Sequence, residues 1–254
     1  MSSQYPSSYT GPVTVVDPLL QCDLGLLMKQ LSSNYDGRPI DSNNLQLTIN
    51  ASDQEQFVVI RDGHVVGAAS LSILPSSFSL EGNIVDQPTA WLASFIVHES
   101  YRGKLKNETS SIATQLWETV LGWAKKHGVH TLEFMTESKR DTAIHFYHHK
   151  GAEDVGTANL YHIPLKTSVD LTDVSPIDGA GIIYETCKTH LALHLYDHTR
   201  ELTTQEISLY TDHAVRRGLS LMQYIVAKDS PAARSLAQAG IAPRREEIIL
   251  RVAL

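Results

Sequence analysis

The sequence contains few cysteines and no long apolar run, and these two absences exclude several classes of protein. Among 254 residues only Cys22 and Cys187 are cysteines, with no Cys-x-x-Cys spacing. Neither a disulfide framework nor a thiolate zinc site is therefore supported, and a reducing compartment is expected. No apolar run approaches the roughly 18 residues of a membrane-spanning helix. The segment Met1–Pro6 lacks the charged and apolar regions of a signal peptide. We expect a soluble, cytoplasmic protein that does not act in a membrane.

Positive charge is also scarce. Lys and Arg number 21 against 28 Asp and Glu, which gives a net charge of −7. Residues 1–165 carry 11 basic against 17 acidic residues, and residues 166–254 carry 10 against 11. Neither part has the basic surface that nucleic-acid binding needs, so no nucleic-acid partner is expected. The composition, 42% hydrophobic and 19% charged, is that of a globular protein. The length predicts either one large domain or two smaller ones.

The N-terminal quarter predicts an arm, a strand, a helix and a hairpin. Residues 1–11 are mostly Ser, Tyr, Pro and Gly, and we expect a flexible arm. Val13–Val16 is a short β-branched strand that ends at a proline. Leu20–Leu31 has leucines and a methionine at helical spacing and predicts an amphipathic helix. Two apolar runs, 56–60 and 65–73, flank Asp62-Gly63, which favours the positive φ angles of a tight hairpin turn.

The stretch from Trp91 to Ala152 contains the features that suggest chemistry. A strand ending at Val97 is followed by the basic turn Arg102-Gly103-Lys104 and a helix predicted over Ser110–His127. The apolar face of this helix consists of Ile112, Leu116, Val120 and Trp123. A strand over Val129–Thr136 and a helix over Ser138–Lys150 follow. Because free N–H groups and the dipole at a helix N-terminus favour an anion, the strand, turn and first helix suggest a phosphate-bearing cofactor.

These residues resemble the GNAT superfamily of acyl-CoA-dependent N-acyltransferases. The resemblance covers residues 12–165 and rests on Val97-x4-Arg102-Gly103-Lys104 before a helix and on Ala143-x2-Phe146-Tyr147-x2-Lys150-Gly151-Ala152. It implies an α/β (α+β) fold with a mixed, mainly antiparallel twisted sheet flanked by helices. It also implies acetyl-CoA (coenzyme A) as the cofactor. The implied activity is N-acetyl transfer to a primary amine of a small molecule or peptide.

The resemblance also assigns cofactor-binding positions. The backbone of Phe95, Ile96 and Val97 would pair with the pantetheine arm as an added strand. The remaining positions, around the pyrophosphate, are Arg102, Gly103, Lys104, Ser110, Ser111, Ile112 and Ala113. Ser111 stands where the family usually has glycine, and Leu105–Ser110 is an insertion of six residues.

Amide formation needs a group that takes a proton from the amine and one that stabilises the departing thiolate. Tyr147 matches the family position that often protonates the thiolate. A second interpretation is that it is a half-buried aromatic residue of an amphipathic helix. The strand position that often carries glutamate matches Ala93, so Glu133 and Glu137 are the candidates for the base, with bulk water as an alternative.

Three further interpretations concern partners and metals. The acidic balance of residues 1–165 favours a cationic acceptor such as a polyamine, an aminoglycoside or a lysine side chain. His145, His148 and His149 have a spacing that suits a metal, but no other ligand is fixed by the sequence, so we interpret them as a solvated helix face and expect no metal. The sequence leaves open a homodimer, and also a GNAT-like binding or regulatory protein that has lost activity.

The C-terminal third repeats the order of the middle. Strands at Leu191–Tyr196, Leu219–Ala227 and Glu246–Leu254 alternate with helices at Thr203–Arg217 and Ser230–Ala239. We infer a tandem arrangement in which residues 12–165 form the catalytic GNAT-like domain and residues 166–254 a second, truncated one. Thr199–Gln205, at the position of the cofactor loop, contains no glycine, and no tyrosine matches Tyr147. A structural role is therefore expected for the second domain.

Overall fold

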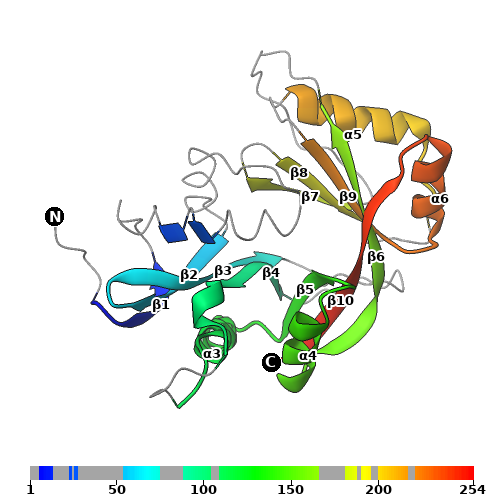
Figure 1. Cartoon of the computed structure of the whole chain (residues 1–254). Coiled ribbons are helices and arrows are strands. Elements are labelled where there is room, and N and C mark those ends of the chain that lie inside the picture. The colour runs from blue at the N-terminus through cyan, green and yellow to red at the C-terminus, as the bar shows by residue number, and fades with distance from the viewer. Residues whose placement is uncertain are drawn as a thin grey trace. The chain divides into compact units, whose positions relative to one another are not determined.

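The computed structural model describes residues 6–13, 23–24, 26–27, 54–74, 88–103, 109–165, 181–187, 190–195, 200–216 and 221–254. The strands are β1 (Tyr9–Val13), β2 (Gln54–Arg61), β3 (His64–Leu74), β4 (Thr89–Val97), β5 (Thr131–Glu137), β6 (Glu153–Pro164), β7 (Gly181–Cys187), β8 (His190–Leu195), β9 (Leu221–Ala227) and β10 (Pro243–Ala253). The helices are a 3-10 turn, η1 (Glu99–Tyr101), and α3 (Ile112–Lys126), α4 (Asp141–His149), α5 (Thr204–Arg216) and α6 (Pro231–Gln238). Figure 1 shows their arrangement.

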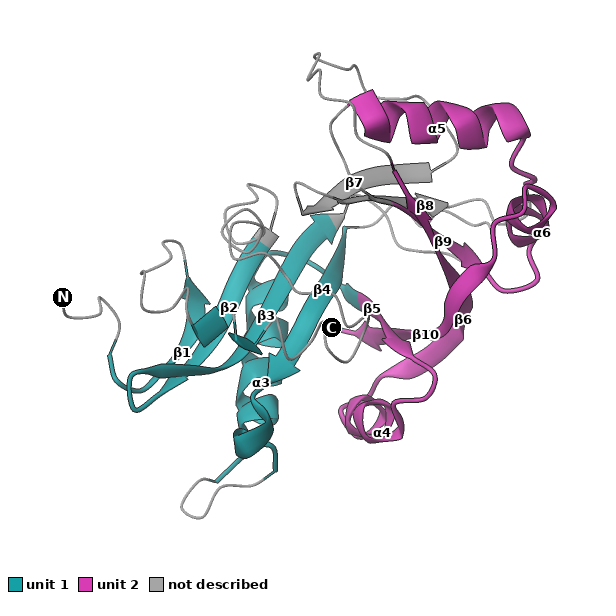
Figure 2. Cartoon of the chain, turned by 45° about the horizontal axis from the view of Figure 1, so that its top comes forward, with its two compact units in different colours: residues 1–74, 88–132, 254 teal, residues 75–87, 133–253 magenta. Residues whose placement is uncertain are grey.

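The contacts divide the chain into two compact units, teal and magenta in Figure 2. Unit 1 consists of residues 1–74, 88–132 and 254, and unit 2 of residues 75–87 and 133–253. The predicted boundary at residue 165 lies inside unit 2, because β6 pairs with both β9 and β10. The predicted domains, which rest on a repeat in the sequence, stay a prediction.

Unit 1 contains four antiparallel strands in the order β1-β2-β3-β4, with α3 packed on them. The predicted hairpin of β2 and β3 is confirmed, since Asp62 and Gly63 have φ angles of 52° and 80°. Both residues of such a tight turn need positive φ angles. The apolar face of α3 is also confirmed, because Ile112, Leu116 and Val120 are each fully buried.

The predicted strand Val13–Val16 is confirmed at Val13, the one residue of it that the structure describes, whereas the arm predicted over residues 1–11 is wrong at Tyr9–Gly11. β1 is Tyr9–Val13, so it includes Tyr9–Gly11 of the expected arm, while residues 14–16 lie outside the described residues. Tyr9–Gly11 form a strand because they pair with β2. Among the described strands β1 lies at the edge of the sheet, where a proline such as Pro12 is tolerated. Of the predicted helix Leu20–Leu31, the described residues are helical, with Leu24 and Leu27 buried and Leu26 exposed.

Unit 2 has the strand order β5-β10-β6-β9-β8-β7, antiparallel at β10–β6, β6–β9 and β7–β8 and parallel at β8–β9. The last strand of the chain, β10, thus lies between β5 and β6. Helices α5 and α6 cover one face of β9 through a core that contains Tyr210, Met222, Tyr224, Val226 and Leu236. The predicted C-terminal strands and helices are confirmed, and their ends differ by at most three residues where the structure describes them. The predicted mixed, mainly antiparallel sheet flanked by helices is confirmed as well.

Candidate active site

Strand β4 is interrupted by a β-bulge. Ser94 pairs with Ser70 and Leu92 with Leu71, so Ala93 is the extra residue on β4. The hydroxyls of Ser70 and Ser94 lie 2.6 Å apart and form a hydrogen bond across the two strands. Ala93 is exposed and Ser94 and Phe95 are half-buried, whereas the rest of β4 is buried. Because bulges bend a strand and re-aim its side chains, the bulge creates an accessible segment in a buried strand.

The three residues expected to contact pantetheine follow the bulge directly. Phe95, Ile96 and Val97 pair with Ala69, Ala68 and Gly67 of β3. The ring of Phe95 packs edge-on against Trp117 of α3, with 5.9 Å between the ring centroids. These contacts fix the end of β4 against both its neighbouring strand and the helix that follows it. Their role in binding a cofactor stays a prediction.

The basic turn begins at the end of β4. Residues Glu99–Tyr101 form η1, which the sequence analysis did not anticipate, and Arg102 ends it. The Nε of Arg102 donates a hydrogen bond to the Val97 carbonyl at 3.2 Å, while the residue remains exposed. Gly103 has a φ of +94°, in the region that favours glycine. Arg102 is therefore tied to the strand end and open to solvent. Lys104 lies outside the described residues, as does most of the inserted loop.

Helix α3 begins with a neutral cap. The N-cap is Ser111, whose hydroxyl accepts a hydrogen bond from the Thr114 N–H at 3.1 Å. The first turn contains no acidic residue. The N–H groups of Ile112 and Ala113 belong to this first turn, which has no acceptors within the helix. The end of α3 therefore has the electrostatic character of an anion site.

Two positioning residues were missed by the sequence analysis. The Nε2 of Gln115 donates to the Ser110 carbonyl at 3.1 Å, and Arg61 at the end of β2 donates to the Oε1 of the same Gln115. This chain of contacts ties Ser110, two residues before the helix, to the end of β2. Gly67 contributes as well, because a Cβ there would lie 3.2 Å from the Ile112 side chain. Arg61 and Gln115 are 54 positions apart, and a single sequence does not show that such distant residues are in contact.

Tyr147 lies in unit 2, on α4. It is 7% exposed, and its ring lies 4.5 Å from that of Phe134 on β5. The ring is thus part of the packing between α4 and β5, as one of the two interpretations expected. Its proposed role as a proton donor stays a prediction.

Glu133 and Glu137 lie on the other face of β5. Since side chains alternate along a strand, both point away from the face on which Phe134 meets Tyr147. Glu133 is fully buried, and Arg251 of β10 donates to its Oε1 from Nε at 2.8 Å and from Nη2 at 2.7 Å. Glu137 lies 3.5 Å from the Nε of Arg140. An adjacent arginine lowers the affinity of a carboxylate for a proton and so weakens it as a general base. The contacts of Glu133 favour a structural role.

A further carboxylate, Glu247 of β10, was missed by the sequence analysis. It is 3% exposed and forms an ion pair with Arg245. Burial raises the pKa of Glu247 above its ordinary value, although the positive charge of Arg245 opposes the shift; the negative charge of Glu137 adds to it. Glu247 could not be singled out from the sequence, because the sequence does not reveal that β10 lies beside β5.

Two other features of the described residues bear on function. No group of three His, Cys, Asp or Glu side chains among them has the arrangement of a metal site. No helix in the described part of the chain is long and apolar enough to cross a membrane.

Comparison with known proteins identifies the family. Residues 26–152 match the family model of the acetyltransferase (GNAT) family. No curated protein has significant sequence similarity to the chain. A solved tandem GNAT protein from the clavulanic acid biosynthesis pathway is 16% identical, with a TM-score of 0.57, over 97% of this chain and 98% of that one. A GCN5-related N-acetyltransferase from Sphaerobacter thermophilus is 11% identical, with a TM-score of 0.55, over 99% and 97%.

The two structures share the fold along nearly the whole chain. The family model covers half of the sequence, including the bulged strand β4, the turn at Arg102, helix α3 and Tyr147. The chain belongs to the acetyltransferase (GNAT) family, a family of acyltransferases.

Proposed function

We propose that the chain is an N-acetyltransferase that transfers an acetyl group from acetyl-CoA to a primary amine of a small molecule or peptide. The observation that carries the proposal is the succession, within unit 1, of the bulged segment Ala93–Phe95, the exposed Arg102 and the N-terminus of α3. An accessible strand segment suits the amide groups of pantetheine. An arginine and a helix N-terminus without acidic residues suit a pyrophosphate.

The chemistry assigns few tasks to the protein. Acetyl-CoA supplies the thioester, whose carbon the neutral amine attacks. The new C–N bond forms as the C–S bond breaks, the amine loses a proton and the thiolate gains one. Arg102 and the first turn of α3 would hold the phosphates, and the Tyr147 hydroxyl would donate the proton to the thiolate. The proton of the amine would pass to water, since Glu133 is committed to Arg251.

The acceptor is proposed to be cationic. Residues 1–165 carry 17 acidic against 11 basic residues, so the field of this part of the chain attracts an ammonium group. A polyamine, an aminoglycoside and a peptide lysine are the acceptor classes to compare.

Calorimetry with acetyl-CoA and an assay of thiol release over these amines test the proposal. We expect Arg102→Glu to weaken acetyl-CoA binding at least tenfold, because it places a negative charge beside the phosphates. Lys126→Glu is the matched control, since it makes the same charge change at the opposite end of α3, and it should leave the dissociation constant within twofold.

Two results would contradict the proposal. An unchanged dissociation constant in Arg102→Glu would place the phosphates elsewhere. Binding of acetyl-CoA without thiol release for any amine would instead support the alternative of a binding or regulatory protein that has lost turnover.

A further inference from the structure

The described elements contain the same succession twice. β4-α3-β5-α4-β6 in the first part of the chain corresponds to β8-α5-β9-α6-β10 in the second. An arginine stands at the same place in each, because Arg102 is the fifth residue after β4 and Arg200 the fifth after β8. The N-terminus of α5 is thus the counterpart, within unit 2, of the proposed phosphate end of α3.

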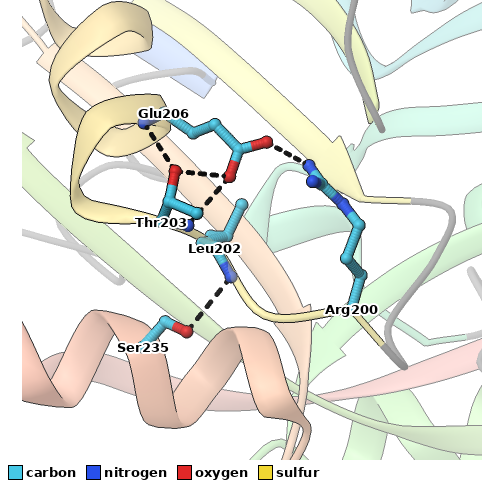
Figure 3. A network of polar contacts seen from close by, with 5 residues as sticks. All are labelled: Arg200, Leu202, Thr203, Glu206 and Ser235. Carbon is cyan, nitrogen blue, oxygen red and sulfur yellow. Dashed lines mark hydrogen bonds and ion pairs between the residues drawn. The ribbon is translucent and has the colours of Figure 1, made fainter.

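The N-terminus of α5 is closed by its own side chains (Figure 3). The Glu206 carboxylate accepts hydrogen bonds from both the N–H and the hydroxyl of Thr203, each at 2.8 Å. The Thr203 hydroxyl in turn accepts from the Glu206 N–H at 3.1 Å. This reciprocal arrangement is a capping box, and it satisfies backbone donors that a helix end would otherwise present to a ligand.

Arg200 and the Leu202 N–H, which lie next to this helix end, also have partners within the chain. Arg200 forms an ion pair with the same Glu206 carboxylate, and the Leu202 N–H donates to the Ser235 hydroxyl of α6 at 3.1 Å. Partial burial alone would raise the pKa of Glu206, but the hydrogen bonds from the Thr203 N–H, Arg200 and the Thr203 hydroxyl lower it. The carboxylate is therefore ionised at neutral pH. It stands where an anionic ligand would otherwise meet the helix dipole and the arginine.

The two helix ends differ in charge. The first turn of α3 contains no acidic residue and begins with a neutral serine, whereas the first turn of α5 contains Glu206. A phosphate approaching α5 would meet a fixed negative charge, and it would have to displace two hydrogen bonds from Thr203 and the ion pair with Arg200 from that carboxylate. A phosphate approaching α3 meets neither obstacle among the described residues.

We propose that Glu206 is a built-in anion that excludes phosphate groups from the N-terminus of α5, so that the chain binds one acyl-CoA, at α3. The count of one rests on the proposed function of the α3 site, whereas the exclusion at α5 does not. At the N-terminus of α5 the Glu206 carboxylate thus takes the place that a phosphate would take at α3.

Two measurements test the proposal separately. The first is the stoichiometry of acetyl-CoA binding by calorimetry, in the wild type and in Arg102→Glu. We expect one acetyl-CoA per wild-type chain, and in the variant only the same single site with affinity at least tenfold lower. Two per chain, or one that persists in Arg102→Glu but is lost in Arg200→Gln, would overturn the proposal.

The second measurement uses inorganic pyrophosphate as the probe, in the Arg102→Glu background. Adding Glu206→Gln should strengthen pyrophosphate binding at least fivefold, because the carboxylate charge is lost and Arg200 is released. Glu201→Gln is the matched control, since it removes the same charge from an exposed side chain that lies five residues earlier, before the helix begins, and it should have no such effect. Equal binding in both double variants would overturn the role of Glu206.

The two measurements also separate this inference from the proposed function. A wild type that binds no acetyl-CoA at all would overturn the proposed function. The pyrophosphate comparison would still decide whether Glu206 closes α5, since it does not depend on α3. Circular dichroism of each variant establishes that it is folded before binding is compared.

Discussion

Glu133 offers a decisive test of whether a candidate base is instead a structural residue. Its side chain is fully buried and receives two hydrogen bonds, at 2.8 and 2.7 Å, from Arg251. Both residues lie in unit 2, on β5 and β10. Replacing Glu133 by alanine would remove the counter-charge and leave the Arg251 guanidinium without its carboxylate partner.

The expected cost follows from the burial of the two partners. Removing one partner of a fully buried ion pair destabilises a protein by about 3–5 kcal/mol. The Arg251 side chain is 37% exposed, so water compensates part of the loss. We therefore expect Glu133→Ala to lower the free energy of unfolding by about 2–3 kcal/mol. For a chain of this size, that corresponds to a fall in Tm of roughly 4–12 °C.

Urea unfolding followed by far-UV circular dichroism measures this cost in Glu133→Ala, Arg251→Ala and the double variant. The double variant should be less destabilised than the sum of the two single variants, because each single change already breaks the ion pair between the two side chains. A loss below about 0.5 kcal/mol in Glu133→Ala would refute the reasoning, since surface substitutions cost that little. In Glu133→Gln, a large fall in kcat with unchanged stability would instead make Glu133 a catalytic base.

Three other substitutions test individual assignments. Tyr147→Phe should leave acetyl-CoA binding unchanged and lower kcat, because only the hydroxyl is lost. Tyr210→Phe is the control, since Tyr210 is also buried. Equal kcat in both variants would mean that Tyr147 serves packing alone. Ser111→Ala should destabilise the protein by about 1 kcal/mol in urea unfolding through loss of the N-cap of α3, and no change would mean that Thr114 finds another acceptor. Glu206→Gln should be less stable than the wild type at pH 7. Because the folded-state pKa of Glu206 lies below the unfolded value of 4.5, its contribution is present above pH 4.5 and is lost as pH falls through the folded pKa. The difference in free energy of unfolding between the two proteins should therefore shrink from pH 7 to pH 3. A difference that stays constant would contradict a stabilising role of the ionised Glu206 carboxylate.

Local elements were predictable because their causes are local. The hairpin depends on Asp62-Gly63, and the start of α3 on Ser111, so each is visible in a few consecutive residues. The strand at Tyr9–Gly11 was missed because the Ser, Tyr, Pro and Gly residues around it suggested an arm, whereas β1 depends on pairing with β2. Local propensity is a weak guide where such pairing decides the structure.

Long-range contacts could not be read from the sequence. Glu133 and Arg251 are 118 residues apart, and their contact exists only because β10 lies between β5 and β6. The sequence therefore offered Glu133 as a free carboxylate near the proposed chemistry. Arg61 and Gln115 were missed for the same reason, since β2 and α3 meet only in the folded chain. The positions of candidate side chains were predictable, but their partners were not.

The N-termini of α3 and α5 show that a missing glycine is weaker evidence against a phosphate site than a carboxylate that occupies the site. The missing glycine at Thr199–Gln205 suggested a cofactor loop that had decayed. A decayed loop would leave first-turn N–H groups to water, and a phosphate could still approach them. Thr203 and Glu206 instead satisfy those donors reciprocally, and Arg200 pairs with the same carboxylate. The end of α5 thus carries a fixed carboxylate that is paired with its arginine, whereas the end of α3 has a neutral cap and an exposed arginine. A ligand that binds only the folded chain stabilises it by mass action, so acyl-CoA would stabilise the protein through α3, while α5 already carries its own anion.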